Sequence, residues 1–457
     1  MRKPGEIDIR KGCFEGANAA SCDPRIYAGF RTWVRILVFA ASLISVFSPA
    51  LAYEDFEDLI RRQFEIYDPQ YEIHRDRFSE HLKAISQAIA ESEAHGRHLY
   101  CSEQMYLEAK WLQGYTAHWD RLEDKLARIE QTLNDNDQSY AKEQSPIDGL
   151  WGACYEEWFM RLGATLSGLE SLAARGEEPR YQLQSPAKID TGKKLLSLLA
   201  DLLVSDIAHT GVDNRSELAS LITTLAQGAF KPHLREILVG SSDLLTSSYL
   251  DQLTEAFRFF LSGAQDPATG YWGAWYIVDG KIHKSLDLSM TYHVIAYTNG
   301  QVEHWPQIIE TTQAIESDSY PYGWRHNGRY NNHNLYDVAK IYKYGWPHMS
   351  ETERLRIGKQ IESMIQWSVS NTFQSDGTFK YDPTFSDSLA DEYYFGISFF
   401  DAVGYWRPSE RFWTGAPVDP KASAMCCRLK QRLKELNLEG WAAEGAMSKI
   451  ELNCGQC

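Results

Sequence analysis

The stretch Tyr320–Trp346 reads YPYGWRHNGRYNNHNLYDVAKIYKYGW and joins an irregular, aromatic-rich loop to an amphipathic helix. Residues 320–334 include no acidic side chain, although the chain as a whole has 62 acidic and 46 basic residues. From about Asn334 onward, apolar residues recur on one helical stripe: Leu335, Val338, Ala339, Ile341 and Tyr342. A polar loop seated on a rigid helix is a common way to present a site. The alternative is a helix connection whose aromatic side chains fill a helical core.

Helical periodicity continues through most of the chain and predicts an all-α fold. We expect two long antiparallel helices over residues 53–135, with a turn near His95–Gly96. Further helices are predicted at 149–174, 193–209, 353–370 and 388–406, and one basic helix around 430–438. Alternating residues flank Asp279–Gly280, a dipeptide typical of tight turns, so a small β-hairpin is predicted there.

Two segments each follow a helix with Gln, Asp, Gly and then an aromatic residue: Gln265–Tyr271 and Gln374–Phe379. They resemble the Gln-Gly-Trp turns of α/α-toroid proteins such as terpenoid cyclases and protein prenyltransferases. The resemblance implies an α/α toroid of helical hairpins, which we assign to residues 148–415. Residues 53–147 would then be a helical extension and 416–457 a cysteine-containing tail. The Asp-x-Asp-Asp acid of the cyclases is absent, so cyclase activity is not expected.

The segment Tyr330–Tyr336, YNNHNLY, resembles the Asn-Asn-His element of α/α-toroid polysaccharide lyases of the alginate-lyase type. Such lyases remove the proton beside a uronic carboxylate, which must first be neutralised by hydrogen-bond donors. A base then takes the proton and an acid protonates the leaving oxygen. The resemblance implies these roles for Asn332 as neutraliser, His333 as base, and Tyr393 or Tyr394 as acid.

One element of that family is missing, because residues 381–406 contain no Lys or Arg. We expect Arg325 or Arg329 to replace the absent arginine. The helix-capping interpretation of the same motif is also open: Asn332 and Asn334 would then cap the helix and His333 would be an ordinary loop histidine.

Two other functions compete with the lyase hypothesis. A glycoside hydrolase needs two facing carboxyl groups, and Asp337 with Asp391 or Glu392 is the candidate pair. A non-catalytic glycan-binding envelope protein is the third hypothesis. The expected cleft lining includes Trp272, Trp324, His293 and Asp287 as substrate-binding residues, where the tryptophans would stack on sugar faces. The histidine spacing matches no established ligand pattern, so neither a metal nor another cofactor is predicted.

Charge and cysteine content indicate the compartment and the partner. The net charge of −16 argues against nucleic-acid binding and counts mildly against a polyanionic substrate. The resemblance to polysaccharide lyases implies a polysaccharide or oligosaccharide as the partner. Cysteines in an exported chain form disulfides; Cys101–Cys154 is the first predicted pair. The four tail cysteines (Cys426, Cys427, Cys454 and Cys457) are expected to form two bridges, with a zinc site as the alternative. A soluble periplasmic or secreted protein is predicted.

The N-terminal segment has the pattern of a signal peptide. Arg31 and Arg35 precede the apolar run 36–47, and Ser48–Ala52 ends in an A-x-A site. An uncleaved anchor is the alternative interpretation. The segment before Arg31 is long for such a leader, so translation starting downstream, for instance at Val34, is a second hypothesis.

Cleavage after Ala52 is the first testable expectation. N-terminal sequencing of the exported protein should give Tyr53 as the first residue, because the small residues of the A-x-A site fit the signal peptidase. A product that retains residues 36–47 would instead establish a membrane anchor.

Overall fold

Amphipathic helices build most of the described chain. The computed structural model describes residues 55–184, 187–243, 245–382, 386, 388–417, 420–438 and 441–454. The leader predicted at 1–52 lies outside these residues. Among them, no helix is both long and apolar enough to cross a membrane.

The N-terminal part folds into four helices: α2 (Phe56–Tyr67), α3 (Tyr71–Ala94), α4 (Tyr100–Gln113) and α5 (Trp119–Thr132). The predicted pair of long helices is therefore divided further. Pro69, which lacks an amide hydrogen, separates α2 from α3. Gly96 makes the predicted turn with φ of 75°. Residues 139–141 form the short 3₁₀ helix η2, and the predicted Cys101–Cys154 disulfide is present.

A buried ion pair joins α4 to α5. The ammonium of Lys125 donates to the Glu108 carboxylate, and both side chains are fully buried. Glu156, which is partly exposed, is a second partner of Lys125 at 3.0 Å. Glu108 also accepts hydrogen bonds from the backbone amides of Glu156 and Glu157, which precede the next helix. This network fixes the helical extension to the chain that follows it.

The middle of the chain departs from the predicted helix boundaries in two places. The helix expected from residue 149 begins only at Trp158, because Gly149 and Gly152 have φ of 72° and 73° and interrupt a right-handed helix. The helix expected over 193–209 ends at Leu203 and gives way to a short strand. The elements here are α6 (Trp158–Arg175), η3 (Ala187–Ile189), α7 (Gly192–Leu203), α8 (Ile207–Thr210), α9 (Arg215–Phe230), α10 (Pro232–Gly240) and α11 (Ser247–Ala264).

A small sheet contains the predicted hairpin. Strands β2 (Trp275–Val278) and β3 (Lys281–Lys284) are antiparallel around Asp279–Gly280, whose φ angles of 50° and 73° suit a tight turn. Strand β1 (Val204–Ser205) pairs with β2 in parallel and was not predicted.

The C-terminal half is helical again, with two helices in the tail where one was predicted. Its elements are α12 (Leu288–Tyr297), α13 (Trp305–Ala314), α14 (Asn332–Gly345), η4 (Trp346–His348), α15 (Glu351–Asn371), α16 (Leu389–Ala402), η5 (Pro408–Glu410), α17 (Pro420–Leu436) and α18 (Trp441–Cys454). A disulfide between Cys426 and Cys454 joins α17 to α18.

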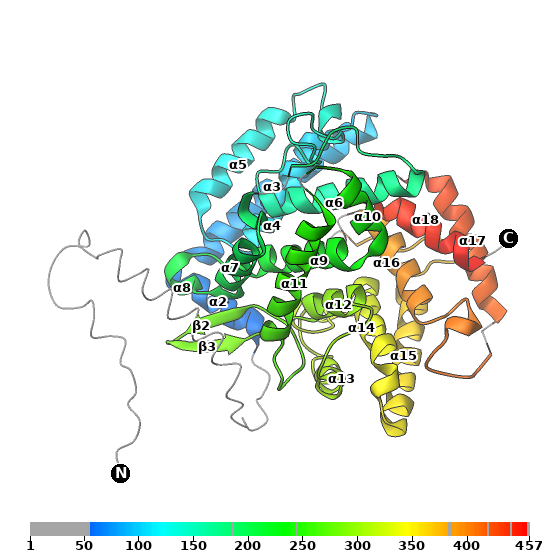
Figure 1. The fold of residues 1–457 in the computed structure, drawn as a ribbon. Coiled ribbons are helices and arrows are strands. Elements are labelled where there is room, and N and C mark those ends of the chain that lie inside the picture. The colour runs from blue at the N-terminus through cyan, green and yellow to red at the C-terminus, as the bar shows by residue number, and fades with distance from the viewer. Residues whose placement is uncertain are drawn as a thin grey trace, which may run out of the picture. The chain divides into compact units, whose positions relative to one another are not determined.

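The helices that carry the candidate site follow one another in space. Helix α6 packs on α9, α9 on α12, α12 on α14, α14 on α16 and α16 on α18. Figure 1 shows the C-terminal pair α17 and α18 beside α16. Ser171 of α6 donates a hydrogen bond to Glu444 of α18 at 2.9 Å, so the last helix of the series contacts the first.

The buried ion pair gives a stability prediction. Lys125→Met should lower the free energy of unfolding by about 3–5 kcal/mol, because Glu108 then loses its buried partner. Urea unfolding followed by circular dichroism measures the change. Lys83→Met, at an exposed position of α3, is the control and should leave stability within about 0.5 kcal/mol. Equal stability of the two variants would contradict the role assigned to the pair.

Candidate functional site

The aromatic loop is locked onto the start of α14. Asn331 caps the helix, because its side-chain oxygen accepts from the backbone amide of Asn334 at 2.8 Å. The Asn334 side chain donates to the carbonyl of Trp324 at 2.9 Å, and Trp324 donates through its indole to the carbonyl of Thr312. Trp324 is fully buried. The loop is therefore held at both sides, and His333 follows in the first turn of α14.

Asn332, the predicted neutraliser, faces α15. Its amide donates to the Thr372 hydroxyl at 3.0 Å and its oxygen accepts from Ser368 at 2.6 Å. The side chain is 2 % exposed. The recorded contacts of Asn332 thus stabilise the packing of α14 on α15, whereas His333 turns to the other neighbour, α16.

His333 and Tyr394 meet around one phenylalanine. The imidazole of His333 stacks on Phe395, with ring centroids 3.9 Å apart and planes at 17°. Tyr394 meets the same ring edge-on at 5.1 Å. Tyr320 lies 5.5 Å from His333, centroid to centroid. His333 and Tyr394 are only partly buried. We call the group His333, Tyr394, Phe395 and Tyr336 the aromatic cluster; Tyr336 lies 6.4 Å from Phe395.

Tyr393, the other predicted acid, points into the core. Successive residues of a helix are about 100° apart around its axis, so neighbours face different surroundings. Tyr393 is fully buried, meets Phe379 edge-on at 5.3 Å and donates its hydroxyl to the carbonyl of Gly377 at 3.1 Å. The structure therefore brings Tyr394, and not Tyr393, beside Phe395 and its partner His333.

His293 lies on α12 next to this cluster. Its ring stacks on Tyr297 at 5.5 Å and also contacts Tyr292, which packs on Tyr336. Desolvation lowers the pKa of His293 to about 3, and the charge of His333 acts in the same direction. Among the described residues its Nδ1 has no hydrogen-bond partner. His293 is therefore neutral at physiological pH.

Asp337 is the buried acid of the site. It is fully buried, and desolvation raises its pKa well above the usual value, with the charge of Asp287 adding to the shift. The Tyr320 hydroxyl donates to its Oδ2 at 3.4 Å and offsets part of this effect. Its Oδ1 has no partner among the described residues. Burial therefore favours the protonated form of Asp337, which can donate a hydrogen bond.

The other candidate carboxylates have partners at helix ends. Asp287 caps α12 through the amide of Met290 and accepts two hydrogen bonds from Arg215, at 2.7 and 3.2 Å. Asp391 accepts from the Ser388 hydroxyl at 3.0 Å. Glu392 accepts from the Ser386 hydroxyl at 2.8 Å, and burial raises its pKa.

The two predicted arginines make their recorded contacts within the loops. Arg325 lies over the Tyr330 ring at 5.0 Å and donates to the carbonyl of Glu316. Arg329 is exposed and lies 3.8 Å from the Asp382 carboxylate. Their substrate-binding role stays a prediction, and the structure records neither of them against the aromatic cluster.

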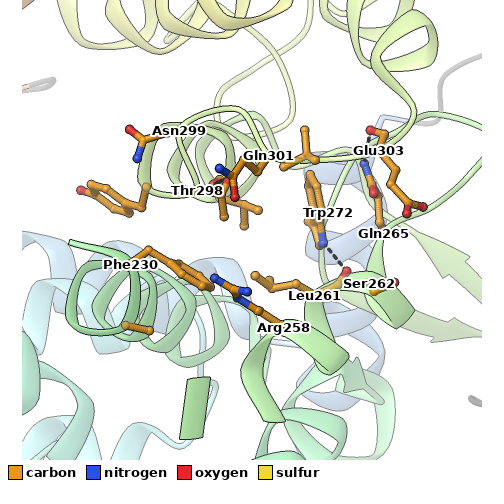
Figure 2. Close-up of a pocket in the computed structure, with 14 residues that line it drawn as sticks. Phe230, Arg258, Leu261, Ser262, Gln265, Trp272, Thr298, Asn299, Gln301 and Glu303 are labelled. Carbon is orange, nitrogen blue, oxygen red and sulfur yellow. Dashed lines mark hydrogen bonds between the residues drawn. The ribbon is translucent and has the colours of Figure 1, made fainter. Parts of the chain in front are cut away.

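Trp272 borders a separate cavity of about 440 Å³ at the C-terminal ends of α9, α11 and α12. Figure 2 shows its indole between Gln265 and the end of α12, with the hydrogen bond to the Leu261 carbonyl. Trp272 is only 2 % exposed, so little of its ring is available for stacking. Tyr297 lines this cavity and also stacks on His293, so the cavity adjoins the site.

Sequence reasoning missed the basic residues of the site. Lys449 of α18 lies over the Tyr394 ring, 3.7 Å from its centroid, and donates to Ser398 at 2.7 Å. Lys231, at the end of α9, pairs with Glu170 of α6. The only sequence signal for Lys449 is its place five residues before Cys454, whose disulfide anchors α18.

The described residues contain no group of three His, Cys, Asp or Glu side chains placed to hold a metal ion. Comparisons of the chain with family models, with curated proteins and with solved structures found no match. The function is therefore argued from the site alone.

The protonated Asp337 gives a pH-dependent stability prediction. The unfolded chain releases this proton above a pKa near 3.8, whereas burial raises the pKa in the folded chain, which holds the proton to a higher pH. Folding stability contributed by this group therefore falls as pH rises, by up to about 1.4 kcal/mol per pH unit. Asp337→Asn, which cannot ionise, should gain stability relative to wild type as pH rises above 3.8, where the unfolded wild-type chain begins to release the proton.

Urea unfolding at several pH values measures this difference. Asp279→Asn, in the exposed hairpin turn, is the matched control and should run parallel to wild type. A constant difference between Asp337→Asn and wild type would show that Asp337 is ionised in the folded protein.

Proposed function

We propose that this protein is an exported carbohydrate-active enzyme that cleaves an acidic polysaccharide by β-elimination. The observation that carries the proposal is that the rings of His333 and Tyr394 both contact Phe395, in partly accessible positions. An imidazole and a phenol are the base and the acid that elimination requires.

We infer an α/α toroid as the scaffold of this site. Support comes from the series α6, α9, α12, α14, α16 and α18, in which each helix packs on the next. The hydrogen bond from Ser171 to Glu444 supports closure of the series into a ring. Contacts between helix starts, such as Trp158 to Glu217 and Arg215 to Asp287, support a parallel arrangement of the first members. The N-terminal ends would then meet at one mouth.

The proposed reaction uses few groups. His333 takes the proton on the carbon beside the substrate carboxylate. The electron pair of that C–H bond forms a carbon–carbon double bond as the neighbouring C–O bond breaks. Tyr394 gives its proton to the departing oxygen, and the product has an unsaturated sugar at its new end. His293 is neutral, and burial favours the protonated form of Asp337, so both groups limit the negative charge that would repel an anionic substrate.

Hydrolysis by paired carboxyl groups is the second candidate, because Asp337 has the raised pKa of a general acid. It also needs a second carboxylate on the other side of the bond. Asp287 is occupied by Arg215 and by the start of α12, and Glu392 is bound by Ser386. These contacts favour elimination. A non-catalytic glycan-binding protein is the third candidate, distinguished by binding without turnover.

Export is supported by the disulfides Cys101–Cys154 and Cys426–Cys454, since such bonds persist in oxidising compartments such as the periplasm or the exterior. The described part of the chain contains no membrane-spanning helix.

The experiment compares two adjacent tyrosines. Wild-type protein incubated with a panel of polyuronates should generate ultraviolet absorbance from the unsaturated product. Tyr394→Phe should lower kcat by at least about 100-fold, because the leaving oxygen loses its proton donor. Tyr393→Phe removes only a core hydroxyl and should keep kcat within about threefold.

An equal change in kcat for the two substitutions would show that Tyr394 is not the acid of the reaction. Reducing-sugar release without the absorbance change would establish hydrolysis, and binding without either signal would establish the non-catalytic function.

A further inference from the structure

Two lysines of the site lack a carboxylate partner. Lys340 of α14 and Lys449 of α18 are both only partly exposed, and among the described residues neither forms an ion pair within 4 Å. Other enclosed lysines have such partners: Lys125 pairs with Glu108, and Lys231 pairs with Glu170. An enclosed ammonium without a counter-ion is costly. The chain has 62 acidic residues, so the missing pairs are not explained by composition.

Both ammonium groups lie around the same aromatic ring. The Nζ atoms of Lys340 and Lys449 are each 5.9 Å from the centroid of Tyr336. Lys449 is also 3.7 Å from the centroid of Tyr394 and donates to Ser398. Ring faces attract cations but do not neutralise them. Lys449 therefore lies beside the proposed acid, Tyr394, and Lys340 lies on the neighbouring ring of Tyr336, close enough for the charge of Lys449 to act on it.

The nearby acids are already engaged with other groups. The negative charge of Asp401 raises the pKa of both lysines. Its carboxylate accepts hydrogen bonds from Arg407 at 2.8 Å and from Asn453 at 3.0 Å. Glu170 is paired with Lys231. Likewise, Glu410 is paired with Lys343 at 3.1 Å. Each acid thus has its own basic or amide partner, and the two lysines keep an excess of positive charge.

The titration behaviour agrees with this geometry. Desolvation is the largest cause that lowers the pKa of both Lys340 and Lys449, to about 8. The charges of Lys343 and Lys449 lower the pKa of Lys340 further, and the charge of Lys231 lowers that of Lys449. Nearby acids raise both pKa values: Asp401 and Glu410 act on Lys340. Asp401 and Glu170 act on Lys449. A bound anion would favour the charged form of both lysines.

We propose that Lys340 and Lys449 form an anion-binding subsite that holds the carboxylate of an acidic sugar unit beside Tyr394. This inference rests on the proposed function and names its substrate class, a polyuronate. A carboxylate is favoured over a sulfate ester because elimination needs an acidic C–H bond next to the bound anion, and the cations stabilise charge that develops on the carboxylate. The lysines supply the positive charge that residues 381–406 lack.

The test measures binding without requiring turnover. Titration calorimetry on the full-length protein uses an oligouronate and the same oligosaccharide with its carboxyl groups reduced to alcohols. Wild type should prefer the charged ligand, and Lys449→Met should bind it at least about tenfold more weakly. Lys281→Met, on the exposed strand β3, is the matched control and should change affinity less than about twofold. Lys449→Arg should retain most of the affinity.

Three results would overturn the subsite. They are equal affinity of wild type for the charged and reduced ligands, unchanged affinity of Lys449→Met, and binding of a sulfated glycan in place of the oligouronate. Affinity should also fall as pH rises through about 8, because the lysines then lose their charge.

A second measurement uses the wild-type protein and is independent of how well the variants fold. Oligouronate should slow the chemical acetylation of Lys340 and Lys449, measured by peptide mass spectrometry, and leave Lys281 unaffected. Absence of protection would contradict the proposal. If the charged ligand binds through Lys449 but no unsaturated product forms, elimination fails while the subsite stands, so the two proposals are separable.

Discussion

The ion pair between Arg215 and Asp287 aligns the helices on which the site depends. Arg215 opens α9, and its two donors reach both carboxylate oxygens of Asp287, which also caps α12. Asp287 is fully buried, and its attraction raises the pKa of Arg215, so the pair persists across the physiological range. The next amide, that of Leu288, donates to the carbonyl of Pro321 at 2.7 Å. The Asp287 carboxylate thus joins α9 to the start of α12, and the adjacent backbone amide of Leu288 joins α12 to the aromatic loop.

Enclosure by these helices determines which groups in the site are charged. Desolvation disfavours the charged form of every group, and each responds according to its partners. Asp287 pairs with Arg215, whereas Asp337 forms no ion pair with any described residue, and desolvation raises its pKa. His293 loses its proton for the same reason. Desolvation also lowers the pKa of Lys340 and Lys449, and neither forms an ion pair with a described residue. Burial thus favours the neutral forms of Asp337 and His293, and the two lysines leave an excess of positive charge in a chain of net charge −16.

Local patterns predicted much of the fold and only part of the site. Apolar periodicity indicated the helices, and Asp279–Gly280 indicated the hairpin, because both depend on residues close in sequence. The Cys101–Cys154 pair was also predicted. The orientation of the Asn332 side chain was not predicted, because its hydrogen-bond partners, Ser368 and Thr372, lie in a distant part of the sequence. Lys449 was assigned to a separate tail, because nothing local indicates that α18 packs on α16.

The rotation of α16 about its axis explains why Tyr394, and not Tyr393, reaches the cluster. A Cβ added at Gly396 would lie 2.5 Å from the Phe379 ring, so the close approach of that ring to α16 requires glycine at this position. Phe379 in turn holds Tyr393. On the opposite side, a Cβ at Gly445 of α18 would lie 2.8 Å from Tyr394. The absence of that atom lets α18 approach closely enough for Lys449 to cover the Tyr394 ring. Two glycines on neighbouring helices therefore select the phenol that faces the cations, through close packing alone.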